Sequence, residues 1–252
     1  MLHRSRPAGC KFRILGATFD TKLLMETAAC ELAAQAHNRL NTILRARRFY
    51  PVGMMMWLYK SLVLSFVEVS TPALYHATPF ALSPVDRVQE RFLLEMELSE
   101  GDALRLFALA PLAARRDIAM LGLIHRVVLG LAPSQFRTFI RPAQAAAFPR
   151  GLRAPDLRHN RQLHDPIDGT QTNMFQRSLL RLIYAYNLLP QHAVDYTNVK
   201  SFQRSLQRAL KTCLETGVED WSSLFTLGVR NFSVLRFQSF FVAGVARPRN
   251  LP

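Results

Sequence analysis

The chain has 252 residues and is 49% hydrophobic, which is enough to bury one large core or two small ones and excludes a chain disordered by composition. Its 32 Lys and Arg residues against 18 Asp and Glu residues give a net charge of +14. Such an excess favours polyanionic partners, because basic side chains displace the counterions that condense on phosphates. The alternative is a compositional bias that raises the arginine content everywhere. The three cysteines lie far apart in the sequence, which excludes a disulfide framework and favours an intracellular location, nuclear or cytoplasmic, over secretion.

The first predicted elements are a short strand and a long helix. The segment from Lys11 to Asp20 is rich in β-branched and aromatic residues and predicts a strand that ends in a turn. Apolar residues then recur at every fourth position from Leu24 to Leu44, which predicts an amphipathic helix that ends before Pro51. The basic residues of its last turn are Arg45, Arg47 and Arg48. On a helix, Arg45 and Arg48 share a face and Arg47 points to the side.

A second, mostly apolar helix is predicted over residues 53 to 70. Its apolar run, Met54 to Val69, is interrupted by Lys60 and Glu68 and is short for a bilayer, so we expect no membrane-spanning segment. The apolar tail from Leu224 to Val245 also carries charged residues, and we expect it to stay out of a membrane for the same reason.

Further helices are predicted downstream. Ser83 and Pro84 form a helix-start signal, with Ser83 as the N-cap, and the polar face of the helix that follows carries arginines four residues apart. These arginines are Arg87 and Arg91. A short helix over residues 103 to 109 and a longer one over 112 to 131, ending at Gly130, come next.

The last third of the chain begins with a segment that breaks the helical pattern. Residues 141 to 172 are rich in Pro, Gly, Arg, His and Asp and predict a long loop or a weak strand pair. Residues 198 to 214 then predict an amphipathic helix whose buried face carries Phe202, Leu206 and Leu210. Together the elements predict a mainly α fold, a bundle of about six helices with a short N-terminal β element.

No motif that carries chemistry is present in this chain. The phosphate-binding loop, the dinucleotide-binding glycine motif, the zinc-protease motif and the nucleophile elbow are all missing. His159 and His164 stand five residues apart without neighbouring cysteines, which is a weak pattern for zinc. Asp20, Glu26 and Glu31 are scattered and do not mark a site for two divalent cations. We therefore predict no catalytic residue, no metal ligand and no cofactor in this chain.

Five short motifs follow one another between residues 10 and 212. A pattern F-x-x-L-G-x-x-x-D is formed by Phe12, Leu15, Gly16 and Asp20. It is followed by NRLNTILRARRF at 38 to 49, and by LYKSLV at 58 to 63 with Glu68 and Pro72 after it. The pattern R-V-Q-x-R is formed by Arg87, Val88, Gln89 and Arg91, and YNLLP stands at 186 to 190 before Phe202 and Leu206. In this order and spacing the motifs resemble the region after the catalytic palm in the reverse transcriptases of jockey-like non-LTR retrotransposons.

The sequence also departs from that family. The aromatic-x-Asp-Asp hairpin that carries the family's catalytic carboxylates stands upstream of the F-x-x-L-G strand and is not in this chain. Tyr186 stands where Trp is common, and His76 and Ala77 stand where Trp usually follows the proline. The resemblance implies a C-terminal fragment of an RNA-directed DNA polymerase that is inactive by itself, with Mg²⁺ expected only in the missing palm.

The resemblance implies a division of the chain into a palm-like end, a thumb-like bundle and a helical extension. The palm-like β element would cover residues 1–20, the thumb-like bundle 21–140, an irregular linker 141–172 and the C-terminal helical extension 173–215. Residues 216–252 resemble no part of the family and stay unassigned.

The resemblance also places basic residues beside a template–primer duplex of RNA and DNA. The predicted nucleic-acid-binding residues are Lys11, Arg13, Arg45, Arg47, Arg48, Lys60, Arg87 and Arg91. Each has a structural alternative. The residues on the strand can be solvated strand ends, the arginines after the first helix can offset its dipole, and Lys60 can be the edge of an amphipathic helix.

Two functional hypotheses follow. In the first, the chain contacts the backbone of the template–primer duplex, with the upstream catalytic part of the parent polyprotein as a second partner and no membrane involved. The alternative is a helical protein-interaction module whose arginine excess is compositional. Binding requires one concave face to gather Arg45, Arg47, Arg48, Arg87 and Arg91. Scattered arginines favour the interaction module. A complete enzyme of another type is a third reading, which the missing catalytic motifs disfavour.

Overall fold

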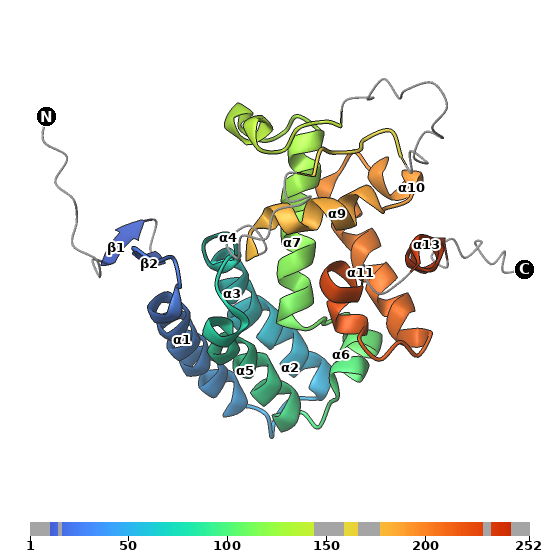
Figure 1. Ribbon diagram of the computed structural model, residues 1–252. Helices are drawn as coiled ribbons and strands as arrows, with labels where there is room; N and C mark the ends of the chain where they lie inside the picture. Colours follow the sequence, from blue (N-terminus) through green and yellow to red (C-terminus); the bar gives the residue numbers. More distant parts are fainter. Residues whose placement is uncertain (1–10, 15–16, 144–158, 166–176, 229–232, 243–252) are drawn as a thin grey trace, which may run out of the picture. The chain divides into compact units, whose positions relative to one another are not determined.

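The computed structural model describes residues 11–14, 17–143, 159–165, 177–228 and 233–242. As predicted, the chain is mainly α-helical, with one small antiparallel sheet near the N-terminus (Figure 1). It forms two compact units, residues 1–112 and 113–252. The division between the two units lies at the start of the helix α7, Leu112–Val128.

The helix α7 belongs to the second unit because its side chains contact that unit. Asp117 accepts an ion-paired hydrogen bond from Arg181 at 3.2 Å. A Cβ atom built at Gly122 would lie 2.3 Å from the side chain of Gln203, so this glycine allows α7 to approach the helix that carries Gln203. A boundary of this kind has no signal in composition, because it depends on contacts between residues far apart in sequence.

The first unit begins with a β-hairpin where a single strand was predicted. Strands β1 (Lys11–Ile14) and β2 (Ala17–Asp20) pair antiparallel, and Phe12 stacks on Phe19 with ring centroids 5.6 Å apart. The predicted strand is thus folded back on itself within ten residues. The motif positions Leu15 and Gly16 lie outside the described residues.

The carboxylate of Asp20 holds the turn between β2 and the helix α1 (Glu26–Leu44). It accepts hydrogen bonds from the backbone N–H groups of Leu24 at 3.0 Å and Met25 at 2.7 Å. Burial acts to raise the pKa of Asp20. The backbone hydrogen bonds from Leu24, Met25 and Lys22 outweigh this effect and hold the pKa below its usual range. Met25 has a left-handed backbone, with φ of 61°, and is fully buried, so Asp20 fixes a strained turn that seats Met25 in the core.

The second helix is continuous from Val52 to Val69, with a π-helical centre. It consists of α2 (Val52–Leu58), η1 (Tyr59–Leu64) and α3 (Ser65–Val69). Among the described residues it is the one helix long and apolar enough, with 18 residues, to span a membrane by length and composition. A third of it is buried in the structure, and core helices of soluble proteins meet the same criteria.

The third predicted helix begins one turn earlier than its sequence signal. After the short α4 (Thr71–Leu74), the helix α5 runs from Pro79 to Glu95, and Thr78 is its N-cap, accepting a hydrogen bond from the Ala81 N–H at 3.1 Å. Ser83 and Pro84 therefore lie inside the helix. Thr78 and Pro79 form the same cap-and-proline signal, and the first of the two signals along the chain starts the helix.

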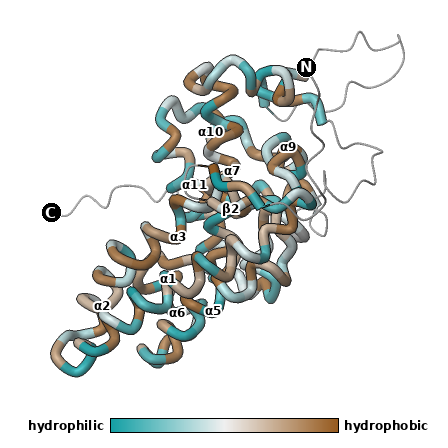
Figure 2. The backbone as a smooth tube through the Cα atoms, turned by 90° about the vertical axis from the view of Figure 1, so that its left-hand side faces the viewer, coloured by the Kyte–Doolittle hydropathy of each residue, from teal (hydrophilic) through white to brown (hydrophobic). Residues whose placement is uncertain are grey.

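The core of the first unit lies between α1, the Val52–Val69 helix and α5. Hydrophobic and hydrophilic positions alternate along α1 and α5 in Figure 2, which gives each helix one buried face. The ring of Tyr59 stacks on that of Phe92 with centroids 4.2 Å apart, and neither ring is exposed. The alanines on the buried face of α1 are Ala28, Ala29, Ala33 and Ala36. The helix α1 packs against α5 and against the Val52–Val69 helix.

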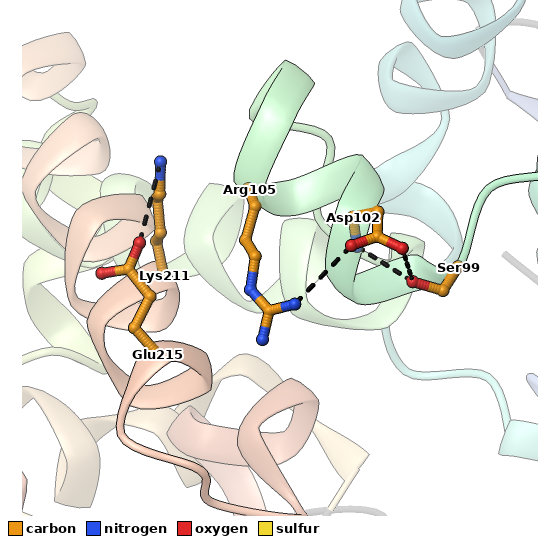
Figure 3. A network of polar contacts seen from close by, with 5 residues as sticks. All are labelled: Ser99, Asp102, Arg105, Lys211 and Glu215. Atoms are coloured by element: carbon orange, nitrogen blue, oxygen red, sulfur yellow. Dashed lines mark hydrogen bonds and ion pairs between the residues drawn. The ribbon is translucent and has the colours of Figure 1, made fainter.

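Local polar contacts stabilise the exposed helix ends and faces (Figure 3). At the start of α6 (Glu100–Phe107), Ser99 accepts a hydrogen bond from the Asp102 N–H at 3.1 Å and donates its hydroxyl to the Asp102 carboxylate at 2.6 Å. On α11 (Val199–Glu215), Lys211 and Glu215 form an ion pair at 3.9 Å. Such exposed pairs contribute at most about 1 kcal/mol each.

The amphipathic helix α11 is the main support of the second unit, as its spacing predicted. Phe202, Leu206 and Leu210 are fully buried, and Asn198 caps its start by accepting from the Lys200 N–H at 2.8 Å. The unassigned tail adds to this core. Trp221, Leu224 and Phe225, in η4 (Trp221–Ser223) and η5 (Leu224–Gly228), are buried. So are Phe237, Phe240 and Phe241 of α13 (Val234–Val242), which packs against α11.

The described parts of the 141–172 segment form a minimal strand pair that one asparagine holds. Pro142 and Leu163 form an isolated antiparallel bridge. The side chain of Asn187, at the end of α9 (Leu182–Asn187), accepts from the Leu163 N–H at 2.8 Å and donates to the Leu163 carbonyl at 2.7 Å. Asn187 thus pairs with Leu163 as a neighbouring strand would.

Two buried histidines of the second unit form hydrogen bonds with Tyr186. Nε2 of His125 donates to the Tyr196 carbonyl at 2.7 Å, and its Nδ1 lies 3.0 Å from the Tyr186 hydroxyl. Nε2 of His159 donates to the Tyr186 carbonyl at 3.1 Å, and its Nδ1 accepts from the Arg161 N–H. Burial lowers the pKa of both imidazoles, and the nearby Arg161 guanidinium lowers it further.

The second unit should therefore lose stability in mild acid. The folded pKa of each histidine lies below the unfolded value of about 6.5, so the folded state binds fewer protons and stability falls as the pH drops below that value. The expected slope reaches about 1.4 kcal/mol per pH unit for each histidine. Urea unfolding of a Trp57→Phe variant, followed by tryptophan fluorescence at several pH values, measures this slope. Trp221 is then the only tryptophan left in the chain, and it belongs to the second unit.

Matched variants separate the buried histidines from the rest of the chain. His159→Gln keeps a donor and an acceptor but does not take up a proton, so the pH dependence should become shallower. His192→Gln alters an exposed histidine and should leave the pH dependence unchanged. A stability that is equal at pH 7.5 and pH 5 would contradict the assignment of neutral buried histidines.

The Asp20 turn gives a second prediction. Asp20→Ala removes the acceptor for two backbone N–H groups and should lower the free energy of unfolding by about 1 to 2 kcal/mol. Asp20→Asn keeps one acceptor oxygen and should cost less. Because the folded pKa of Asp20 is lowered, this contribution is present above about pH 4 and is lost as the pH falls through the folded pKa. Urea midpoints followed by circular dichroism measure the effect, and an unchanged midpoint for Asp20→Ala would rule it out.

Candidate nucleic-acid interface

Four of the eight predicted binding residues line one open pocket of the first unit. The pocket has a volume of about 610 Å³ and is lined by the four arginines Arg45, Arg47, Arg48 and Arg91, together with Asn41, Leu44, Phe49 and Glu95. We call it the arginine pocket. The four guanidinium groups come from two segments more than 40 positions apart, which only the packing of α1 against α5 brings together (Figure 1).

The arginine pocket lies where α1 and α5 both end. Asn41 and Leu44 belong to the last turn of α1, and Arg91 and Glu95 to the last turns of α5. A helix C-terminus carries a partial negative charge of roughly half an elementary charge, so part of the positive charge is offset by the two helix ends. Four guanidinium groups and one carboxylate still leave a clear positive excess.

The helical spacing argument for the arginine run fails, because α1 ends at Leu44. The backbone from Arg45 to Tyr50 forms turns, so Arg47 does not point away from its neighbours. It lines the same pocket and forms an ion pair with Glu95 of α5. The side chains of Arg45, Arg48 and Arg91 have no hydrogen bond or ion pair within the described part of the chain, which leaves their donors open to an anion.

The other predicted residues do not join this pocket. Arg87 lies on the exposed side of α5, one turn before Arg91, and does not line the pocket. The Lys60 ammonium donates to the carbonyl of Phe107, which supports the reading of Lys60 as a helix edge. Lys11 and Arg13 are exposed and lie on one face of β1, because they are two residues apart on a strand.

The other four pocket residues were not predicted from the sequence: Asn41, Leu44, Phe49 and Glu95. Glu95 places a carboxylate among the arginines, and Phe49 contributes an aromatic ring that is 81% exposed. The sequence offered a signal for Phe49, since an aromatic directly follows the arginine run. It offered none for Glu95, whose place depends on how α5 packs against α1.

Several residues of the family-like motifs have packing roles in this structure. Val88 and Gln89 are buried on α5, and the Gln89 side chain donates to the Ala110 carbonyl at 3.1 Å. Tyr186 is buried against the histidines of the second unit, and burial raises the pKa of its hydroxyl. The motifs thus describe the hydrophobic core of each unit as well as any binding surface.

The residues that the structure describes do not gather ligands for a metal ion. Within the described ranges, no three His, Cys, Asp or Glu side chains lie close enough together to hold a metal ion. A second cavity, of about 690 Å³, lies in the second unit and is lined mainly by apolar residues with Arg137 and Arg161. Arg161 uses its guanidinium to donate to the Val194 carbonyl at 2.6 Å, so it contributes to the fold of that unit.

Comparisons with known proteins give no relative. Neither protein-family models, nor curated proteins, nor solved structures match this chain. The geometry of the arginine pocket therefore carries the functional argument.

Proposed function

We propose that the chain binds the sugar–phosphate backbone of nucleic acid through the arginine pocket, as part of a retrotransposon reverse transcriptase whose catalytic carboxylates lie elsewhere. The single observation that carries the proposal is the convergence of Arg45, Arg47, Arg48 and Arg91 on one open pocket. Guanidinium groups bind phosphates through paired hydrogen bonds and retain their charge at any physiological pH. The link to template–primer duplexes comes from the family resemblance of the sequence motifs.

The use of arginines elsewhere in the chain supports this reading. Arg39 donates to the Leu62 carbonyl at 3.3 Å and its guanidinium lies 3.9 Å from the centre of the Phe66 ring. Arg126 donates to the Leu131 carbonyl at 3.0 Å. Those arginines have partners within the fold, whereas three of the pocket arginines point their donors at solvent. A cluster of like charges destabilises the fold slightly, so a bound anion gives the cluster a role.

The competing proposal is a helical protein-interaction module. The observation that favours it is a set of exposed apolar side chains in the first unit, which includes Trp57 at 63%, Phe80 at 81% and Leu94 at 78% exposed. An acidic partner protein would also suit the arginine pocket. The two proposals differ in salt dependence and in the need for phosphates, which the following measurements test.

Replacing Arg45 and Arg48 together should weaken nucleic-acid binding without unfolding the chain. We expect a loss of about 1 kcal/mol for each phosphate contact removed, and a salt slope, log K against log salt, reduced by about one per contact. Fluorescence anisotropy with a duplex at several salt concentrations measures both. Both side chains are exposed, so the free energy of unfolding, measured by urea titration, should change by less than about 0.5 kcal/mol.

The matched control is Arg204→Ala, an exposed arginine of the second unit. It should leave both affinity and salt slope unchanged. If the Arg45/Arg48 variant binds as tightly as the parent at every salt concentration, the arginines serve the helix ends and the surface, and the interaction module becomes the better proposal.

Replacing Glu95 should have the opposite effect on duplex binding. Its carboxylate competes with phosphate for Arg47, so Glu95→Gln frees that guanidinium and should strengthen duplex binding by a few-fold at low salt, with a steeper salt slope. The lost ion pair is partly exposed and contributes at most about 1 kcal/mol to stability. Anisotropy titrations at about 50 mM salt measure the gain, and unchanged or weaker binding would place the phosphates outside the pocket.

A further inference from the structure

The ring of Phe49 is an exposed aromatic in the wall of a cationic pocket. It lines the arginine pocket beside Arg45, Arg47, Arg48 and Arg91, and 81% of it is open to solvent. Its backbone position is fixed, because the Phe49 N–H donates to the Ala46 carbonyl at 2.9 Å in the turn that follows α1. The exposed ring contributes little to the core, and its place in the wall of the arginine pocket, which Phe80 does not share, leaves it accessible to a ligand bound there.

Phosphate binding alone does not use an aromatic ring. A duplex presents its phosphates to the solvent but keeps its base faces stacked on one another, so along its length it offers no free base face for Phe49 to stack on. An unpaired nucleotide presents both a phosphate and a free base face. Stacking of a base on an aromatic side chain is favourable for all four bases, and sites that combine stacking rings with basic groups are typical of single-stranded nucleic-acid binding.

We propose that the arginine pocket recognises an unpaired nucleotide, with its phosphate on the arginines and its base stacked on Phe49. This inference rests on the proposed function, since it assigns a substrate form to the same pocket. It predicts a preference for single strands, or for the single-stranded end of a duplex, over a blunt duplex. Tyr50, which is 48% exposed and follows Phe49 directly, lies beside this surface without lining the pocket.

The chain offers a matched control in Phe80. It is also 81% exposed and belongs to the same unit, at the start of α5. Arg91 lies 11 positions further along that helix, which separates the two residues by about 16 Å along the helix axis. Phe80 does not line the arginine pocket. Phe80→Ala thus removes the same side chain and the same exposed surface without touching the proposed site.

The experiment measures binding of the full chain to three labelled probes with the same number of phosphates. The probes are oligothymidylate, the same backbone with abasic positions throughout, and a blunt duplex. We expect the parent protein to bind oligothymidylate more tightly than the abasic strand. Phe49→Ala should lose at least about fivefold on oligothymidylate and change less than twofold on the other two probes. Phe80→Ala should change less than twofold on all three.

The outcomes separate this inference from the proposed function. If the parent protein binds oligothymidylate and the abasic strand equally, or if Phe49→Ala loses as much on the abasic strand, base stacking on Phe49 is excluded. If the double variant Arg45→Ala with Arg48→Ala still binds all three probes more weakly than the parent protein, phosphate binding at the pocket stands without base stacking. If the parent protein binds none of the probes at low salt, both the proposed function and this inference are overturned. If the urea midpoint of Phe49→Ala equals that of the parent protein, the lower affinity comes from a lost contact and not from a less stable fold.

Discussion

The packing of α1 against α5 is the contact on which the candidate site depends. The two helices pack against each other, with Ala28, Ala29, Ala33 and Ala36 buried on α1 and Val85, Val88 and Phe92 buried on α5. These side chains lock the rotation of both helices, because a turn of either helix would expose apolar surface at about 25 cal/mol for each Å². With the rotation fixed, the C-terminal ends of both helices meet at the arginine pocket.

That meeting of helix ends gives the pocket a definite electrostatic character. Two helix C-termini attract cations, so some positive charge at this place stabilises the first unit by itself. The pocket nonetheless holds more guanidinium groups than two half charges and Glu95 offset. Surface pairs of this kind add little stability, so the fold alone does not account for the excess. In the function that we propose, an external anion would bind this excess charge, and the Glu95 carboxylate would compete with that anion for Arg47.

The second unit uses polar groups in a different way. Its core contains a connected set of hydrogen bonds among His125, Tyr186 and His159, every one of which satisfies a buried group. The ring of His125 also stacks on Phe202 of α11 with centroids 4.1 Å apart. Burial raises the pKa of the Cys213 thiol to about 11, which keeps it protonated on the same helix. These groups are buried and paired, so they serve the architecture of the unit and make it sensitive to acid.

The sequence by itself determined the helical class, the buried faces of α1 and α11, and the end of α7 shortly before Gly130. These features depend on periodicity and on local capping, which neighbouring residues settle among themselves. The start of α5 was misplaced by one turn because two equivalent cap signals follow one another and local energies do not choose between them. The residues from Lys11 to Asp20 fold into a hairpin where one strand was predicted, since strand pairing depends on a partner as well as on propensity.

Only the tertiary structure decided which arginines form a site. Arg45, Arg47 and Arg48 were visible as a run, but the helix end at Leu44 brought Arg47 into the pocket, and α5 supplied Arg91 and Glu95. Arg87 shares a helix with Arg91 and yet lies outside. Neither the boundary between the two units nor the burial of Trp221, Phe225 and Phe237 could be predicted from the sequence. Each of these features depends on contacts between residues distant in sequence, and no local pattern encodes a distance across the fold.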